Sequence, residues 1–256
     1  MRKPPSPENV LAGIPGWEDA TLAKLSGGLT NRTWRVDGID RRAVLKIDAA
    51  PRSTPYNSRL QEAQIQSTAA RHGLANPVLH VGENVYMTEY LNGNVWSDSA
   101  LDDDSNLTRL AMALRKLHSL PLTGRTFDAA SAARDYAGRI GSADEDMVRD
   151  CIRVIESLPL PRNLCCCHND LVAANIIAAP EIRFLDWEYA CDNDPFFDIA
   201  TVVAHHRLPE ERANFLLDAY FDGDGARWRE YLATQVHFYN ALLWLWLQAR
   251  RTVNNY

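Results

Sequence analysis

The sequence predicts an α+β protein in which a small antiparallel sheet with one helix precedes a larger, mainly helical part. Before residue 90, short runs of β-type residues alternate with turn residues, whereas apolar residues recur mostly at helical spacing afterwards. The turn-like segment Asn92-Gly93-Asn94 separates these two patterns. We therefore expect two domains, residues 1–90 and residues 91–256.

Composition and charge limit the class of protein. The chain has 256 residues, of which 46% are hydrophobic and 23% charged, as is typical of soluble globular proteins. Its formal net charge is −6 and it lacks blocks of Lys and Arg, so nucleic acid is not an expected partner. No apolar run is long enough to span a bilayer, and the first residues lack a secretory signal. We expect no membrane span and a cytoplasmic location.

The first part of the chain contains the strands, turns and caps of a small sheet domain. Three strands between residues 22 and 48 predict an antiparallel meander, with Gly27 and Gly28 in its first turn. Ser58 is a suitable N-cap for a helix over residues 59–71, which Gly73 would end. Short strands at residues 78–81 and 86–90 complete the predicted sheet.

The second part is mainly helical and contains one β-type segment. Apolar residues at helical spacing from Leu107 to His118 predict a helix that ends at Pro121, and a second helix is predicted over residues 134–155. Residues 164–185 return to β-type patterning, with a turn at Pro180. Everything after Asp198 is expected to be helical.

Three of the five cysteines are consecutive: Cys165, Cys166 and Cys167. Neighbouring side chains on a strand point to opposite faces, so this run does not suit an ordinary disulfide framework, and its spacing is not that of a CxxC zinc site. We expect these residues to act as small buried hydrophobic residues in a reducing compartment.

The segment from His168 to Asn175 indicates phosphoryl transfer. It reads H-x-D-x-x-x-x-N, and after a short hairpin it is followed by Asp186. Phosphoryl transfer needs hard oxygen ligands for Mg²⁺ and a carboxylate beside the attacking hydroxyl. We therefore assign Asp170 as the catalytic residue that orients or deprotonates the acceptor, and Asn175 and Asp186 as metal ligands.

Residues of the types that position ATP phosphates in protein-kinase-like folds occur upstream of this segment, in the expected order. Lys46 ends an apolar strand and Glu62 lies early in the next predicted helix, as needed for the Lys–Glu pair that positions ATP phosphates. Gly27 and Gly28 leave room for backbone amides to approach phosphate oxygens. This turn does not match G-x-x-x-x-G-K-[ST], so the chain is not expected to be a Walker-type ATPase.

Taken in order, these motifs resemble the choline/ethanolamine kinase family, and the Asn193-Asp194-Pro195 to Ala200 segment resembles its bacterial choline-kinase-like branch. That family is grouped with aminoglycoside phosphotransferases and thiamine kinases in a bilobal protein-kinase-like fold. The resemblance implies ATP and Mg²⁺, an ATP-binding lobe at residues 1–90 and a catalytic and substrate-binding lobe at residues 91–256. It also implies that Glu89 to Leu91 form the hinge that meets adenine, and that Asp198 braces the catalytic loop.

The acceptor is expected to be a small cationic alcohol. Between residues 163 and 198, seven acidic residues stand against the single Arg183. Aromatic faces bind quaternary ammonium groups through cation–π attraction. Choline kinases have a late helix with two Trp three residues apart, which the last part of this chain resembles. Trp246 fits the second of these positions, and Leu243 occupies the first. The residues assigned to substrate binding are Trp187, Glu188, Tyr239 and Trp246.

The sequence thus predicts an ATP-dependent phosphotransferase that acts on the primary hydroxyl of choline or ethanolamine, by direct in-line transfer. A thiamine kinase or an aminoglycoside phosphotransferase remains an alternative. A non-catalytic, pseudokinase-like binding protein is an alternative of another class. The presence of Lys46, Asp170, Asn175 and Asp186 together favours an enzyme.

Overall fold

The computed structural model describes residues 5–25, 31–49, 58–141, 144–158, 161, 163–178 and 180–254. The chain divides into two compact units. The first, here called the sheet unit, contains Met1–Trp96 and Ala174–Ala190; the second, the helical unit, contains Ser97–Ala173 and Cys191–Tyr256. This division differs from the predicted boundary at residue 90, because residues 174–190 also belong to the first unit.

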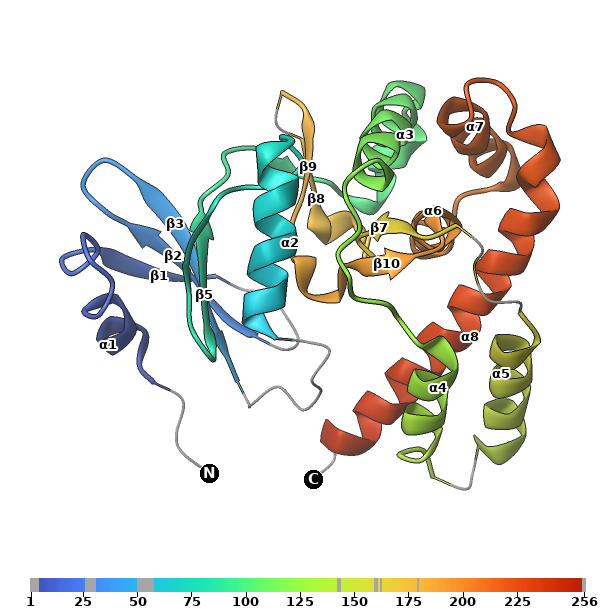
Figure 1. Ribbon diagram of the computed structural model, residues 1–256, viewed down its shortest axis with the longest axis horizontal. Helices are drawn as coiled ribbons and strands as arrows, with labels where there is room; N and C mark the ends of the chain where they lie inside the picture. The colour runs from blue at the N-terminus through green and yellow to red at the C-terminus, as the bar shows by residue number, and fades with distance from the viewer. Residues whose placement is uncertain are drawn as a thin grey trace. The chain divides into compact units, whose positions relative to one another are not determined.

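A five-stranded antiparallel sheet is the main feature of the sheet unit (Figure 1). The first three strands follow one another in space as they do in sequence, which confirms the predicted meander. The next two strands exchange places, so that the order is β1-β2-β3-β5-β4. The strands are β1 (Thr21–Leu25), β2 (Asn31–Asp37), β3 (Arg42–Asp48), β4 (Val78–Val81) and β5 (Val85–Glu89).

One face of this sheet is apolar and is covered by the N-terminal segment. Alternate residues of β3, namely Ala43, Leu45 and Ile47, are completely buried in one cluster. Helix α1 (Pro7–Leu11) adds Leu11 to this cluster, and the following turn adds Trp17. Side chains alternate along a strand, so Val44 and Lys46 point to the opposite face. The alternation along β3 therefore places the core residues on one face of the sheet and Lys46 on the other.

Helix α2 (Arg59–Arg71) lies on the other side of the sheet from α1 (Figure 1). The Ser58 hydroxyl caps it by accepting a hydrogen bond from the Gln61 amide at 3.2 Å. Gly73 has a φ of 72°, which glycine adopts without steric cost, just after the C-cap His72. The predicted start and end of this helix are confirmed.

A second, three-stranded sheet explains why residues 174–190 belong to the sheet unit. Its order is β6-β8-β9, formed by Asn94–Val95, Ile176–Ala178 and Ile182–Phe184. The Trp96 amide donates to the Ile176 carbonyl at 2.9 Å, and the Phe184 amide donates to the Leu74 carbonyl at 2.8 Å. These backbone bonds join the hairpin to elements from the first 96 residues.

The helical unit contains the remaining helices and one short β-ribbon, in which β10 pairs with β7. The predicted helix over residues 134–155 is wrong in one respect: two helices replace it. The first begins earlier, where Asp128 accepts a hydrogen bond from the Ser131 amide at 2.8 Å, and it ends at Gly138. Gly138 and Gly141 both disfavour helix continuation. The elements are α3 (Asp104–His118), α4 (Ala129–Ala137), α5 (Glu145–Ser157), β7 (Cys165–Cys167), β10 (Cys191–Asn193), α6 (Pro195–His205), α7 (Glu210–Tyr220) and α8 (Arg229–Asn254).

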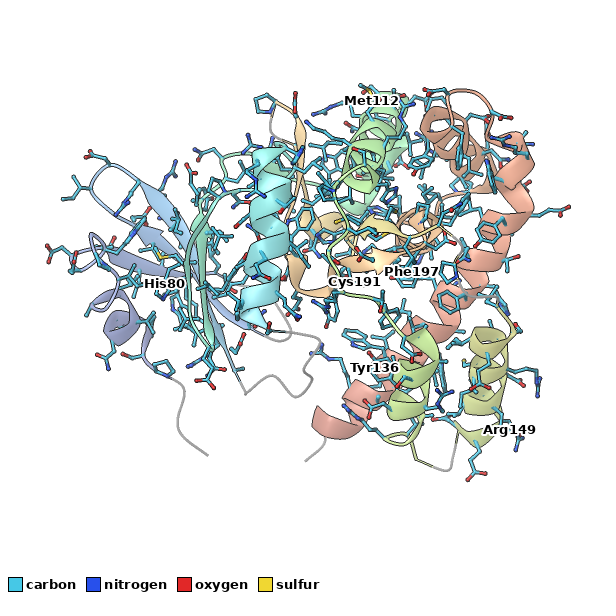
Figure 2. The ribbon with its side chains drawn as sticks, viewed as in Figure 1. His80, Met112, Tyr136, Arg149, Cys191 and Phe197 are labelled. Carbon is cyan, nitrogen blue, oxygen red and sulfur yellow. The ribbon has the colours of Figure 1, made fainter. Side chains whose placement is uncertain are left out.

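Helix α6 is the central element of the helical unit. It is buried along nearly its whole length and packs against α8. Phe197, labelled in Figure 2, forms edge-to-face contacts with Phe238 and Tyr239 of α8, with ring centroids 5.9 and 5.6 Å apart. Asp198, the next residue, is also completely buried. Among the residues that the structure describes, no helix combines the length and apolar character needed to cross a membrane.

Candidate active site

Lys46 lies on β3, on the face opposite the apolar cluster. Its ammonium group forms an ion pair with Asp186 at 2.9 Å. Burial by itself would lower the pKa of Lys46, but the charges of Asp186 and Glu62 outweigh that effect and raise the pKa above its usual value. Lys46 is therefore cationic at neutral pH, and it can bind a phosphate group.

Asp186 and Asn175 are placed by one β-hairpin. Because Ile176 pairs with Phe184, Asn175 lies opposite Leu185, whose amide donates to the Asn175 carbonyl at 2.8 Å. Asp186 follows directly and has a left-handed backbone with a φ of 63°, a conformation that Asp tolerates better than most residues. One carboxylate and one side-chain amide oxygen are the hard donors that Mg²⁺ prefers. The donor set of the hairpin therefore fits the predicted metal.

Glu62 belongs to a buried ionic cluster on α2. Its carboxylate binds the Arg59 guanidinium at 2.6 Å, and the same guanidinium binds Asp48 at 2.5 Å. Glu62 also raises the pKa of Lys46 through its charge. The pairing of Lys46 with Glu62 stays a prediction, while Lys46 forms a 2.9 Å ion pair with Asp186.

The predicted hinge begins at the end of β5. The Glu89 amide donates to the Pro77 carbonyl at 2.9 Å, and the Glu89 carbonyl accepts a hydrogen bond from the Asn76 side chain at 2.5 Å. Both backbone groups of Glu89 are therefore already engaged. Gly27 and Gly28, the predicted phosphate-binding turn, lie outside the described residues.

The loop that carries Asp170 is held by Asp198 of α6. The amides of His168 and Asn169 donate to the two Asp198 oxygens at 2.8 and 2.7 Å. Asn169 has a φ of 63° and accepts a hydrogen bond from the Asn193 side chain at 2.8 Å. These charge-assisted bonds hold the backbone immediately before Asp170. The hydrogen bonds expected between Asp198 and this loop are present.

Tyr239 on α8 has a pKa that the charge of Asp170 affects. Burial raises the pKa of Tyr239 to about 12, and the charge of Asp170 adds to that increase, whereas a hydrogen bond with Thr201 opposes it. The phenol of Tyr239 and the carboxylate of Asp170 therefore interact electrostatically within the helical unit.

The other predicted substrate residues have different surroundings. Trp246 is seven residues after Tyr239 on the same helix, about 10 Å further along its axis, and the Arg250 guanidinium lies 4.7 Å from its ring centroid. Trp187 is completely buried, and its indole N–H donates to the Phe184 carbonyl at 3.0 Å. Glu188 beside it is also buried. In this conformation Trp187 belongs to the core of the sheet unit, and a cation already covers the ring of Trp246.

Several acids that suggested a cationic substrate have structural partners. Asp192 accepts hydrogen bonds from the amides of Thr123 and Gly124 at 2.6 and 2.9 Å. Asp194 caps α6 through the Phe196 amide and accepts a hydrogen bond from the Tyr231 hydroxyl at 2.6 Å. The local excess of acids therefore supports a cationic substrate less strongly than the sequence suggested.

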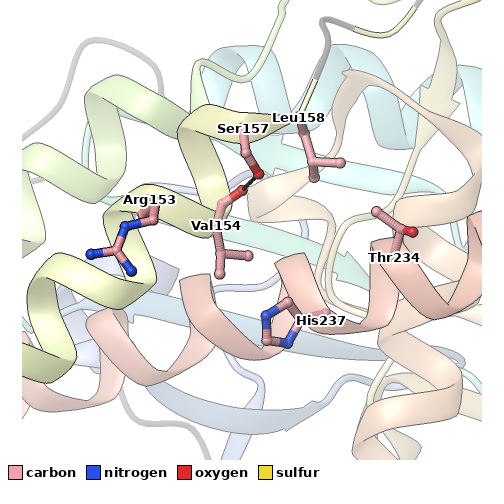
Figure 3. A pocket seen from close by; sticks show the side chains of 6 residues that line it. All are labelled: Arg153, Val154, Ser157, Leu158, Thr234 and His237. Carbon is pink, nitrogen blue, oxygen red and sulfur yellow. Dashed lines mark hydrogen bonds between the residues drawn. The ribbon is translucent and has the colours of Figure 1, made fainter.

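A pocket of about 300 Å³ lies elsewhere in the helical unit, lined by residues of α5 and α8 and by Leu158 (Figure 3). Arg153 at its edge pairs with Asp150 at 3.0 Å, and the Ser157 hydroxyl donates to the Val154 carbonyl. None of the predicted site residues lines it.

Sequence reasoning missed two positioning groups. From the sequence, Arg59 was predicted only as the first residue of a helix. An arginine at the start of a helix does not by itself indicate which buried carboxylates it will bind. His118 was noted only within a helix, although its Nε2 lies 3.1 Å from Asp198 Oδ2. In both cases the signal lies in residues far along the chain and could not be found from local spacing.

The chain belongs to the phosphotransferase enzyme family, which it matches over residues 21–233. The predicted resemblance to choline/ethanolamine kinases is confirmed by the relatives that the chain matches. Protein LicA of Haemophilus influenzae is 33% identical over 207 residues, which are 76% of this chain and 61% of that protein. The chain thus spans less than two thirds of that relative's length.

Two solved structures confirm the protein-kinase-like fold. A choline/ethanolamine kinase family protein from Mesorhizobium loti is 26% identical and has a TM-score of 0.76, covering 97% of this chain and 86% of that one. Choline kinase LicA from Streptococcus pneumoniae shares the fold with a TM-score of 0.77 at 18% identity, over 95% of this chain and 89% of that one.

Proposed function

We propose that this chain transfers the γ-phosphate of ATP to the primary hydroxyl of a small cationic alcohol, with choline and ethanolamine as the candidate acceptors. The Lys46–Asp186 ion pair carries the proposal, because it joins two predicted phosphoryl-transfer residues that are far apart in sequence. Similarity to choline/ethanolamine kinases supports the class of acceptor.

The sheet unit would bind the nucleotide. Lys46 would exchange its contact with Asp186 for ATP phosphate oxygens, and Leu91 would offer backbone groups to adenine. Asp186 and Asn175 would hold Mg²⁺, which when bound neutralises charge on the phosphates. The ion pair of Lys46 with Asp186 keeps the lysine oriented before nucleotide arrives.

The helical unit would bind the acceptor. Asp170 would accept a hydrogen bond from the acceptor hydroxyl and take its proton as the phosphate is transferred. Asp198 limits the movement of the backbone that precedes Asp170. Tyr239, whose pKa is raised in part by the charge of Asp170, would present an aromatic surface to the cationic group. No separate nucleophile is needed, so transfer would be direct.

An ATP-consumption screen tests the acceptor. We expect turnover with choline and with ethanolamine, and none with thiamine or an aminoglycoside, when each is supplied with ATP and Mg²⁺. Choline binds through its apolar cationic face, whereas the ethanolamine ammonium also donates hydrogen bonds, so the ratio of their kcat/KM values reports which recognition the site uses.

Other outcomes of the screen would contradict the proposal. Turnover with thiamine or an aminoglycoside alone would favour those alternatives. ATP binding without consumption for any acceptor would favour a pseudokinase-like binding protein.

Replacing Lys46 by Met is expected to raise the KM for ATP and lower kcat, together reducing kcat/KM by roughly 10²-fold, as loss of a charged phosphate contact of about 3 kcal/mol implies. The KM for the alcohol should change little. Lys24→Met is the matched control, because Lys24 is an exposed lysine of β1. Equal kinetic effects in the two variants would remove Lys46 from the nucleotide site.

A further inference from the structure

Three metal-ligating side chains meet in the helical unit, outside the residues assigned to the reaction. A ring nitrogen of His118 and the sulfurs of Cys165 and Cys167 all lie within 4.8 Å of one another. His118 is the last residue of α3, and the two cysteines are alternate residues of β7. Alternate residues of a strand share a face. Two of the three consecutive cysteines therefore place their thiols near the same imidazole, in addition to the packing role expected from the sequence.

The distance between the two sulfurs fits a shared cation. Cys165 Sγ and Cys167 Sγ are 3.5 Å apart. Two thiolates bound to one tetrahedral zinc ion at about 2.3 Å each lie about 3.8 Å apart, whereas a disulfide requires about 2.05 Å. Small side-chain adjustments would therefore suffice for a metal to bridge the sulfurs.

His118 is oriented in the way that metal-binding histidines usually are. Its Nε2 lies 3.1 Å from Asp198 Oδ2, and its Nδ1 lies 2.8 Å from the Tyr220 hydroxyl. The carboxylate accepts the Nε2 proton, which leaves the Nδ1 lone pair free to accept from Tyr220. A carboxylate behind the imidazole fixes the ring and raises its basicity as a ligand.

From this geometry we infer that Cys165, Cys167 and His118 form a binding site for a soft divalent cation, zinc. Two sulfurs and one imidazole nitrogen favour zinc over Mg²⁺, which prefers oxygen donors. The fourth position would be taken by water. Binding as thiolates releases the two thiol protons to solvent. Cys165 is only partly buried, which gives the ion a route from solvent.

The site adjoins the catalytic loop through shared groups. Asp198 holds both His118 and the amides of His168 and Asn169, and Cys167 directly precedes His168. A cation that draws Cys167 and His118 together would therefore shift the backbone before Asp170. We expect zinc occupancy to lower kcat; this consequence rests on the proposed function, whereas the binding itself does not.

Direct metal binding tests the inference on the full chain after treatment with a chelator. We expect one Co²⁺ to bind with a thiolate-to-cobalt absorption band in the near ultraviolet, and Zn²⁺ to displace it. Cys165→Ser should weaken Zn²⁺ binding by at least tenfold and reduce the band. Cys166→Ala is the matched control, because Cys166 lies between the two ligands and points to the other face of β7.

Other results would contradict parts of the inference or of the proposed function. Absence of the band in the wild-type chain, or equal zinc affinity in the wild-type chain and Cys165→Ser, would overturn the site. Stoichiometric binding of Cu⁺ but not of Zn²⁺ or Co²⁺ would overturn the assignment of zinc. If zinc binds but lowers kcat equally in wild type and Cys165→Ser, coupling to the loop is overturned. A chain that binds zinc but consumes no ATP contradicts the proposed function alone.

Discussion

Replacing Asp170 by Asn is expected to reduce kcat by roughly 10²- to 10⁴-fold, which is the usual contribution of a positioned general base. The substitution keeps the shape of the side chain and removes its charge and its basicity. The KM for ATP should change little, because the nucleotide contacts are assigned to the sheet unit. Steady-state kinetics with varied ATP and varied alcohol would separate the two effects.

A control is needed because the loop around Asp170 also has structural contacts. Asp102→Asn changes an exposed acid of the same helical unit and should leave kcat unchanged. Thermal unfolding of the Asp170→Asn variant should match that of the wild type closely enough to show that Asp198 still holds the loop. An unchanged kcat in a folded Asp170→Asn variant would refute the catalytic assignment.

Replacing Arg59 by Leu is expected to destabilise the protein by about 3–5 kcal/mol, the usual cost of removing one partner of a buried ion pair. The guanidinium is only 1% exposed and binds Asp48 and Glu62, whose side chains are 3% and 0% exposed. It also donates to Asn31 at 2.8 Å. The substitution removes the guanidinium that pairs with these two buried carboxylates.

Chemical denaturation would measure this loss. Arg71→Leu is the matched control, because Arg71 is an exposed arginine on the same helix, and surface changes of this kind usually alter stability by no more than about 0.5 kcal/mol. Similar free energies of unfolding for the two variants would show that the Arg59 cluster does not stabilise the sheet unit. Glu62 lies in this cluster and affects Lys46, so the Arg59 variant should also raise the KM for ATP.

Local features of the sequence predicted most of the secondary structure. The meander was predictable because its turn residues and alternating strands are adjacent in the chain, and α2 was predictable because Ser58 and Gly73 mark its two ends. The helix expected over residues 134–155 shows the limit of this reasoning. Periodic apolar residues continue across Gly138 and Gly141, yet the helix is interrupted there. The low helix propensity of the two glycines outweighs the periodic pattern.

Partners that are distant in sequence could not be predicted in the same way. The sequence did not indicate the 2.9 Å ion pair between Lys46 and Asp186, because that contact depends on the hairpin of β8 and β9 belonging to the sheet unit. Trp187 follows Asp186 directly, yet it is buried, since the turn after β9 directs it onto Phe184. Tyr239 was one of several aromatic candidates, and its electrostatic interaction with Asp170 could not be predicted from the sequence.

The sequence by itself determined the class of fold, the family and the residue types for phosphoryl transfer, because these depend on local patterns and on motif spacing. Only the tertiary structure decided which groups meet: Arg59 with its two carboxylates, Asp198 with the catalytic loop, and His118 with Cys165 and Cys167. The physical reason is that ion pairs, hydrogen bonds and metal ligands act over a few ångströms, and packing alone determines which distant residues come that close.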